Sequence, residues 1–211
     1  MDPDRRVVLS QLQAAVSSLR GAPRLSTGAT LPERQTDLPS GLAGLPRWPR
    51  PGLIELSGRP GSGRLGLWAP AAALLTRQGA PVAVVDPLGR LYPPGLVGLR
   101  WERLLLLQPA AEQAAWATEQ LAQSGAFPLV VLLDPPRLGK AGARLERAAE
   151  RGECALFIVN ESVDLHLPAS LRVQALSRRG ERLSVALRRV SASTSSRNCT
   201  NKGCALVYVR P

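Results

Sequence analysis

The sequence predicts an α/β fold in which a mostly parallel central sheet is flanked by helices and followed by an antiparallel C-terminal hairpin. Five short, continuous apolar runs recur along the chain, at 53–56, 82–85, 104–107, 129–133 and 155–159. Continuous runs are typical of strands that are buried on both faces, as the strands of a parallel sheet are. Helical patterns separate the later runs, at 110–124 and 140–151, with another candidate at 65–78. The chain therefore alternates between strand and helix as a parallel sheet requires.

The C-terminal part of the chain has the pattern of an antiparallel hairpin. Apolar and polar residues alternate over 171–177 and 183–189, around a turn that contains Gly180, and this alternation indicates strands with one solvated face. Six arginines of the hairpin form a candidate surface for DNA or an acidic partner: Arg172, Arg178, Arg179, Arg182, Arg188 and Arg189. A solvated basic hairpin is the alternative. Residues 204–209 have enough β-branched content to pair with another strand.

The chain divides into four predicted segments. These are an N-terminal amphipathic helix over 1–21, a Pro- and Gly-rich linker over 22–52, the α/β core over 53–190 and a Ser-rich tail over 191–211. Within the linker, the proline-dense run 46–51 is predicted to form no regular element. The apolar face of the helix carries residues at spacings of three and four, which suit contact with another protomer or with a partner: Leu9, Leu12, Val16 and Leu19.

The charge of the chain is strongly positive, with 27 Lys and Arg residues against 16 Asp and Glu residues. Such a surface is attracted to polyanions such as DNA and to acidic partner surfaces, although an arginine-rich codon bias is an alternative explanation. No run of about 18 apolar residues exists, so no membrane span is predicted. The N-terminus has no signal-peptide apolar core, and three cysteines cannot make an even disulfide framework. A cytoplasmic protein fits these features best.

Residues 56–68, LSGRPGSGRLGLW, have almost the spacing of a loop that binds phosphate. Three glycines would let successive backbone N–H groups converge on phosphate oxygens at a helix N-terminus: Gly58, Gly61 and Gly63. A working loop continues with Lys and then Ser or Thr, but this one continues with Arg64 and Leu65. Arginine binds phosphate but is not interchangeable with lysine, and leucine offers no hydroxyl to magnesium. A chance Gly-rich turn is the alternative.

Pro70 and two aspartates complete the candidate site. Pro70 falls where the helix behind the loop is expected to be in its second turn, so it favours a kink. Asp86 and Asp134 each end a predicted strand, and the carboxyl ends of parallel strands face the ligand crevice of an open α/β sheet. Each aspartate could therefore orient magnesium, or it could simply cap the following turn.

Histidine and cysteine offer no convincing site for metal or nucleophilic chemistry. His166 is the only histidine and lacks a partner for either, so a structural role is expected. Cys154 lies beside an apolar run and is expected to be a small core residue. Cys199 and Cys204 are two thiols without a second pair, and a zinc site there would need ligands from elsewhere. We therefore predict no metal site.

Several segments together resemble the core of RecA-type recombinases, and more specifically the ImuA family of RecA-like accessory proteins, sometimes labelled SulA-like. The segments GLIELSGRPGSGR and VAVVDPLGRLYP are similar to the first strand with its loop and to the second strand of the recombinase core. The most specific match is LLLLQPAAEQAAWATEQLAQSGAFPLVVLLD, and ALFIVNES resembles the strand that ends in a phosphate-sensing polar pair. The resemblance runs from about Leu38 to Arg189 and implies a RecA-like core.

The same register marks three departures from the recombinase pattern. Leu88 stands where the recombinase has its catalytic glutamate, Glu161 where it has its sensing glutamine, and Arg64 with Leu65 where it has Lys-Thr. Three parts of the ATP-hydrolysing site of the recombinase are altered together. The resemblance therefore implies little or no ATPase activity, no catalytic residue and no required cofactor. What is left is a vestigial nucleotide site: Gly58, Gly61, Gly63, Arg64 and Asp134.

The resemblance implies a non-catalytic scaffold in the SOS DNA damage response and in error-prone translesion synthesis. Its implied partners are ImuB, which is a polymerase-like protein, an error-prone polymerase III alpha-type subunit and, through the N-terminal helix, RecA or a second copy of the chain. Two alternatives stay open. One is a weak ATPase that uses ATP and magnesium with Arg64 in place of the loop lysine, and the other is a basic protein that binds DNA through the hairpin arginines.

Overall fold

The computed structural model describes residues 37–42, 45–92, 95–179, 182–189 and 205–209. The predicted N-terminal helix, with Leu9, Leu12, Val16 and Leu19, lies outside the described residues, and so does the first part of the predicted linker, 22–36. No helix of the described residues is long and apolar enough to cross a membrane.

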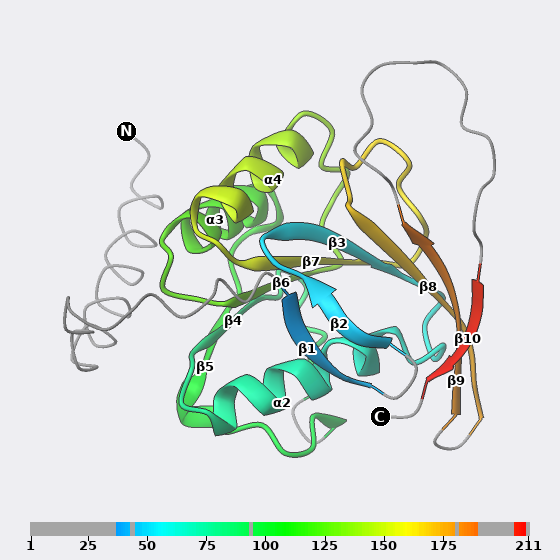
Figure 1. Ribbon diagram of the computed structural model, residues 1–211. Coiled ribbons are helices and arrows are strands. Elements are labelled where there is room, and N and C mark those ends of the chain that lie inside the picture. Colours follow the sequence, from blue (N-terminus) through cyan, green and yellow to red (C-terminus); the bar gives the residue numbers. More distant parts are fainter. Residues whose placement is uncertain (1–36, 43–44, 93–94, 180–181, 190–204, 210–211) are drawn as a thin grey trace, which may run out of the picture. The chain divides into compact units, whose positions relative to one another are not determined.

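The core is an eight-stranded sheet with the strand order β10-β9-β8-β3-β7-β6-β4-β5 (Figure 1). All the pairs from β8 to β5 are parallel, whereas β9 and β10 join antiparallel beyond β8. This arrangement confirms the predicted fold class, hairpin included. The strands run over Gly52–Ser57 (β3), Val82–Val85 (β4), Leu104–Leu107 (β5), Leu129–Leu133 (β6), Ala155–Asn160 (β7), Leu171–Arg179 (β8), Arg182–Arg189 (β9) and Ala205–Val209 (β10).

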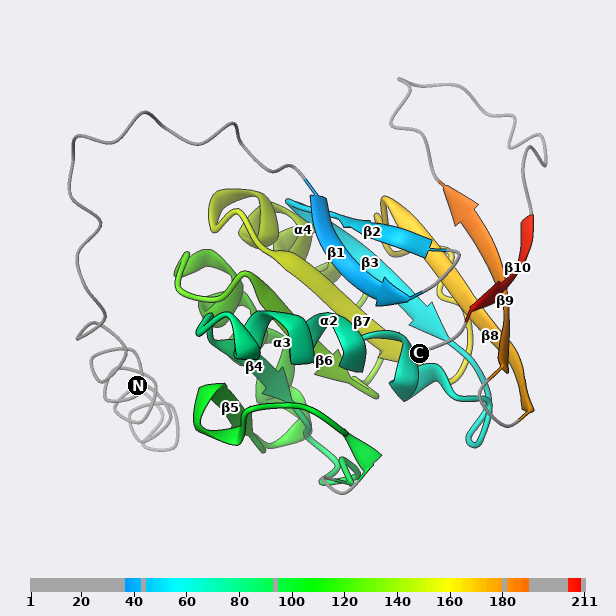
Figure 2. The same cartoon turned by 60° about the horizontal axis from the view of Figure 1, so that its bottom comes forward.

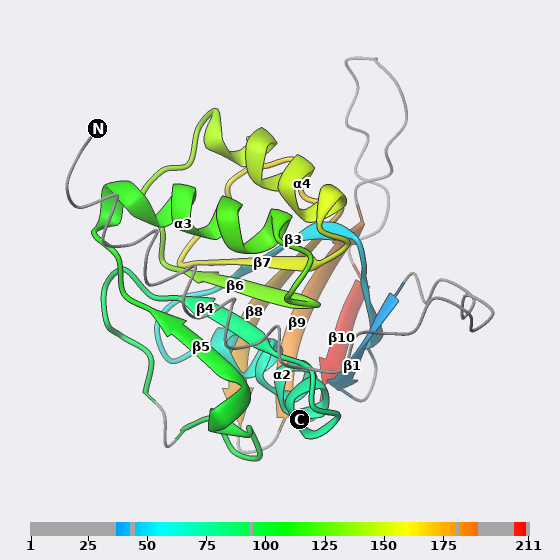
Figure 3. The same ribbon diagram turned by 90° about the vertical axis from the view of Figure 1, so that its left-hand side faces the viewer.

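Helices cover both faces of the parallel part of the sheet. Helices α3 (Ala111–Gln123) and α4 (Ala141–Arg151) pack together on one face, and α2 (Ala69–Arg77) lies on the other (Figure 3). Because both faces are covered, every residue of β4 and β6 is buried. The apolar runs in the sequence are therefore continuous because the strands are buried on both faces, as predicted.

The segment predicted to be a linker contains a regular hairpin, and this corrects the prediction for residues 37–49. Strands β1 (Asp37–Leu42) and β2 (Leu45–Pro49) pair antiparallel next to α2 (Figure 2). Trp48 is fully buried, and its ring centroid lies 5.1 Å from that of Phe157. Each strand of a two-stranded sheet has one edge without a neighbouring strand. Proline is tolerated there because the N–H that it lacks would have no strand partner. The free energy gained by burying the large ring of Trp48 therefore exceeds the cost of the prolines in this stretch.

The predicted C-terminal tail also contributes a strand to the sheet. Within the described residues 205–209, β10 pairs antiparallel with β9, and Val207 lies opposite Val185. The β-branched content of this stretch therefore has a pairing partner, as the sequence indicated. The outer edge at the other side of the sheet is β5, which pairs only with β4 among the described strands.

Candidate functional site at the carboxyl ends of the parallel strands

The Gly-rich loop follows β3 and is shaped by its glycines. Gly61 and Gly63 have φ angles of 79° and 87°, a left-handed conformation that glycine adopts without steric cost. Gly58 is required for a different reason: a Cβ atom there would lie 2.4 Å from Ser62 Oγ and 2.8 Å from the carbonyl oxygen of Ala175. The three glycines therefore permit the tight backbone turn between β3 and the helix that follows it.

The helix behind the loop begins later than the sequence indicated. A short 3-10 helix, η1, covers Arg64–Leu67, and α2 starts at Ala69 with Pro70 in its first turn. The predicted kink in one helix over 65–78 is therefore replaced by a break. Proline is tolerated in the first turn because the backbone N–H that it lacks has no partner there. Pro70 also packs against β1, since a Cβ on Gly41 would lie 2.7 Å from Pro70 Cβ.

Two backbone donors of the loop are used within the loop itself. The N–H of Ser62 donates to the carbonyl of Arg59 at 3.0 Å, and the N–H of Gly66 donates to the carbonyl of Gly63 at 2.9 Å. A phosphate-binding loop directs such donors at the ligand. In this loop these two N–H groups are satisfied without one.

Arg64 is the central side chain of the site, and its guanidinium group turns inward. Nη1 donates to the carbonyl of Gly58 at 3.0 Å, and Nη2 lies 2.8 Å from both carboxylate oxygens of Asp134. The Arg64 side chain is 8% exposed and that of Asp134 is 13% exposed. The cation that would face a phosphate and the carboxylate that would orient a metal ion therefore neutralise each other. Charge-assisted hydrogen bonds of this kind contribute about 1.5–3 kcal/mol each.

Asp134 occupies an unusual backbone position at the end of β6. Its φ angle is 41°, which costs a non-glycine residue on the order of 1–3 kcal/mol and is most common at functional sites. Burial raises the pKa of the Asp134 carboxyl above its ordinary value, while Arg64 and Arg90 act to lower it. The ion pair with Arg64 holds the carboxyl in place in spite of this burial.

A second group of charges lies on the solvent side of Asp134. Arg90 Nη1 is 4.0 Å from Asp134 Oδ2 and 3.7 Å from Glu161 Oε1. The loop that carries Arg90 and Leu88 is held by Asp86, whose Oδ2 accepts the N–H of Leu91 at 2.7 Å. The structure therefore shows the turn-capping contact of Asp86, whose Oδ1 is buried without a hydrogen-bond partner among the described residues, and a role toward magnesium stays a prediction.

A buried ion pair beneath the site was missed by the sequence reasoning. Glu55, in the middle of β3, is fully buried, and its Oε2 accepts a hydrogen bond from Arg172 Nε at 2.8 Å. Glu55 Oε1 accepts the backbone N–H of Asp164, and Arg172 Nη2 donates to the carbonyls of Leu165 and Leu167. The signal was present, because a glutamate interrupts the apolar run Leu53-Ile54-Glu55-Leu56, and buried acids need a partner.

This pair corrects the assignment of Arg172 to the DNA or partner surface. Its side chain is only 11% exposed, and its donors are used inside the protein. The other five arginines of that set are placed by strand register alone: Arg178 is opposite Leu183, Arg179 opposite Arg182, Arg188 opposite Arg172 and Arg189 opposite Leu171. Their role as a surface stays a prediction.

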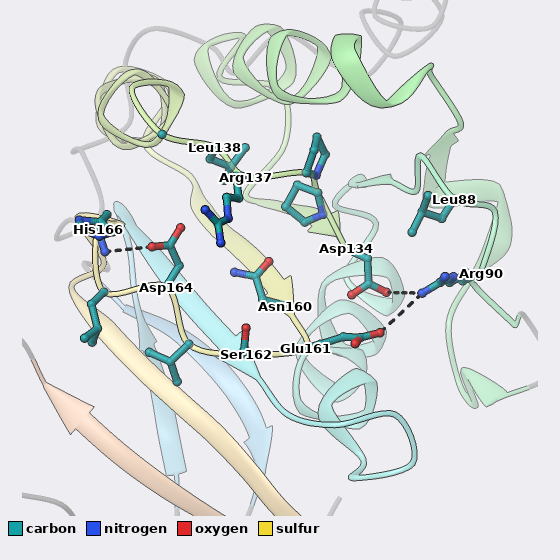
Figure 4. Close-up of a pocket in the computed structure, with 15 residues that line it drawn as sticks. Leu88, Arg90, Asp134, Arg137, Leu138, Asn160, Glu161, Ser162, Asp164 and His166 are labelled. Carbon is teal, nitrogen blue, oxygen red and sulfur yellow. Dashed lines mark hydrogen bonds and ion pairs between the residues drawn. The ribbon is translucent and has the colours of Figure 1, made fainter.

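A pocket of about 710 Å³ opens beside Asp134, between the loops that follow β6 and β7. Figure 4 shows Asp134, Arg90 and Glu161 at one end and His166 with Asp164 at the other, and Arg137 points into the space between Asp164 and Asn160. His166 donates its backbone N–H to Asp164 Oδ1 at 3.0 Å. The pocket therefore combines apolar loop residues with charges of both signs.

The described residues hold no cluster of three or more His, Cys, Asp or Glu side chains suited to a metal ion. Cys154 is buried beside β7, and burial raises the pKa of its thiol to about 12. This confirms the expected core role of Cys154, because a thiol that stays protonated is a poor nucleophile and metal ligand. Cys199 and Cys204 lie outside the described residues.

The chain is similar in sequence to RecA proteins. It is 29% identical over 216 aligned residues to the protein RecA 1 of Myxococcus xanthus, an alignment that covers 95% of this chain and 55% of that protein. It is 27% identical over 180 residues to the RecA protein of Pseudomonas fluorescens, covering 84% of this chain and 43% of the relative. The chain therefore spans about half the length of these relatives. No protein-family model matches it.

The structure is similar to the crystal structure of the RadB recombinase, with a TM-score of 0.57. The sequence identity is 19%, and the match covers 76% of this chain and 87% of the RadB chain. Together with the sheet order and the loop after β3, this likeness shows that the fold is RecA-like. The RecA-like part of the resemblance found in the sequence is thus confirmed, and its ImuA-specific part stays a prediction.

Proposed function

We propose that this chain is a non-catalytic, RecA-like accessory protein that helps to assemble a DNA-repair complex. The observation that carries the proposal is the ion pair between Arg64 and Asp134, which joins the two charged groups that a nucleotide and its metal ion would need. Binding a nucleotide would require this pair to separate and Asp134 to lose its closest counter-ion. Leu88 adds support, since it offers no carboxylate to activate a water molecule.

Isothermal titration with ATP and magnesium tests this proposal directly. We expect the full chain to show no saturable heat, because the guanidinium of Arg64 already occupies the carboxylate of Asp134. The matched control is Arg147→Ala, which removes an exposed arginine of α4 and should leave the titration unchanged. Submicromolar, magnesium-dependent affinity for ATP would instead favour the weak-ATPase alternative.

Exposed apolar side chains at the β5 edge support a role in assembly. Seven large apolar side chains are exposed among the described residues, and two of them lie on β5 or directly before it, Leu106 and Trp101. Groups of exposed apolar residues mark interaction sites, and β5 has no second neighbouring strand among the described ones. The proposal uses this edge as a contact for a protein partner.

The identity of the complex is the finer part of the proposal. By its resemblance to ImuA proteins, the chain would act in SOS mutagenesis and translesion synthesis with an ImuB-type protein and an error-prone polymerase III alpha-type subunit. Contact with RecA is assigned to the N-terminal segment with Leu9, Leu12, Val16 and Leu19. Deleting residues 1–22 should abolish capture of purified RecA in a pull-down, and undiminished capture would exclude this contact.

A further inference from the structure

We propose that the pocket between the β6–α4 and β7–β8 loops binds a short peptide of a partner protein, in which an aspartate or glutamate is flanked by apolar residues. Its carboxylate would pair with Arg137, and its apolar neighbours would lie against the proline and leucine side chains of the pocket. This inference deepens the proposed function and rests on it in one respect, namely that the chain has protein partners.

The wall formed by residues 161–167 is rigidly held from below. The buried pair of Glu55 and Arg172 takes up one backbone N–H and several carbonyls of this loop, including the N–H of Asp164 and the carbonyl of Leu167. A loop whose backbone is tied to a buried ion pair keeps its shape without a ligand. Pre-organisation of this kind lowers the ordering cost of binding.

The opposite wall, residues 134–138, is held as firmly. Asp134 is tied to Arg64, and Leu138 is buried with its carbonyl accepting the N–H of Ala141 at 2.8 Å. Arg137, between these anchors, is exposed and points into the pocket (Figure 4). Two braced walls therefore present one long cationic side chain to whatever enters.

Arg137 is the lining cation that is available to a ligand. Within the described ranges it has no ion-pair partner within 4 Å, whereas Arg90 lies 3.7 Å from Glu161 and 4.0 Å from Asp134. A guanidinium group binds a carboxylate through two parallel hydrogen bonds. The hydroxyl of Ser162 and the ring of His166 line the same space and supply further polar contacts.

The remaining charges of the pocket favour a peptide over a nucleic acid strand. Glu161 is half exposed, and Asp164 lines the same pocket (Figure 4). A phosphodiester chain carries a negative charge at every nucleotide and would be repelled by both carboxylates. A peptide can place one carboxylate on Arg137 and leave uncharged residues next to Glu161 and Asp164.

The size and apolar content of the pocket agree with this ligand. Its volume of about 710 Å³ falls within the range of about 300–1,000 Å³ in which proteins enclose drug-sized ligands. Apolar side chains line both walls, with Pro135, Pro136 and Leu138 on one and Val163 and Leu165 on the other, and Leu88 lines the pocket from the loop after β4. A short segment with one acid and adjacent leucine or phenylalanine side chains fits such a lining, whereas a folded domain would not enter it.

The experiment uses the full chain labelled with 15N and the blocked tetrapeptide Leu-Asp-Leu-Phe as the probe. We expect saturable chemical-shift changes of the Gly139 and Ser162 amides, and a loss of affinity of about tenfold or more in Arg137→Ala, as removal of one charge-assisted contact predicts. The peptide Leu-Asn-Leu-Phe should show the same loss on the wild type. Arg147→Ala is the matched control and should bind like wild type.

Three results would overturn the inference. These are no saturable shifts at the pocket amides, an affinity that Arg137→Ala leaves unchanged, and tighter binding of an eight-residue oligothymidylate than of the peptide at the same amides. Since Arg137 is exposed, a thermal melt of Arg137→Ala should match that of the wild type and show that the variant is folded. The ATP titration is an independent measurement, so failure of the peptide site and failure of the non-catalytic proposal are distinguishable.

Discussion

The Gly-rich loop and the neighbouring pocket share Asp134 but have opposite properties. On the loop side, Arg64 is buried and pairs with Asp134, so the positive charge has its partner inside the chain. On the pocket side, Arg137 is exposed and has no ion-pair partner within 4 Å among the described residues. Both regions have an arginine at the carboxyl end of the same sheet. The difference shows that residue type does not decide whether a site is open to a ligand, because the location of the counter-ion does.

The largest effect is expected from the buried pair under the pocket. Glu55→Gln or Arg172→Ala should destabilise the fold by about 3–5 kcal/mol, because each leaves the partner charge buried and uncompensated. Urea unfolding followed by circular dichroism measures the change. The apolar double replacement Glu55→Leu with Arg172→Met should recover part of the loss. An unfolding free energy like that of the wild type in both single variants would show that this pair does not brace the pocket wall.

The loop-side pair should have the next largest effect. Arg64→Ala leaves the carboxylate of Asp134 with only the more distant Arg90, so we expect a loss of about 2–4 kcal/mol, somewhat below that of a fully buried pair. The same urea titration measures it, with Arg137→Ala as the matched control on the open side. Equal effects of the two alanine variants would contradict the contrast between the closed and the open region.

Separating the pair of Arg64 and Asp134 tests whether this pair keeps nucleotide out of the Gly-rich loop. The double change Arg64→Lys with Leu65→Thr frees Asp134 from the guanidinium and restores a hydroxyl that magnesium can bind. We expect saturable, magnesium-dependent ATP binding where the wild type shows none, without turnover, since Leu88 still offers no base. Titration calorimetry and a phosphate-release assay measure the two quantities. Unchanged affinity would mean that the loop, and not the ion pair, keeps nucleotide out.

The smallest effect concerns the titration of Asp134. Its pKa is raised because burial disfavours the charged form more than Arg64 and Arg90 favour it. The folded chain then holds this proton more tightly than the unfolded chain, so stability should fall as the pH rises through the folded pKa. A 13C NMR titration of the carboxyl should give a midpoint above 3.8, and Asp134→Asn should remove the signal. A midpoint below 3.8 would show that the arginines dominate.

Local pattern was enough to predict the central part of the fold. Runs such as 129–133 and 155–159 became β6 and β7 almost without change, because a strand buried on both faces needs apolar residues at every position. The hairpin β1–β2 was missed, since prolines near Trp48 hide the strand signal and the burial of that ring against Phe157 is a long-range effect. The predicted kink at Pro70 was wrong, because Pro70 lies in the first turn of α2 and the helix expected over 65–78 is interrupted before it.

The sequence by itself determined the RecA-like α/β fold, the place of the Gly-rich loop and the absence of the lysine and hydroxyl that nucleotide binding uses, because these depend on residue type and local spacing. Only the tertiary structure decided which charges meet. Arg64 reaches an aspartate 70 residues away, and Arg172 leaves the predicted surface to pair with Glu55, 117 residues away. The strand order of the sheet brings β3, β6, β7 and β8 together and so determines which charged side chains can pair. This order cannot be read from spacing along the chain.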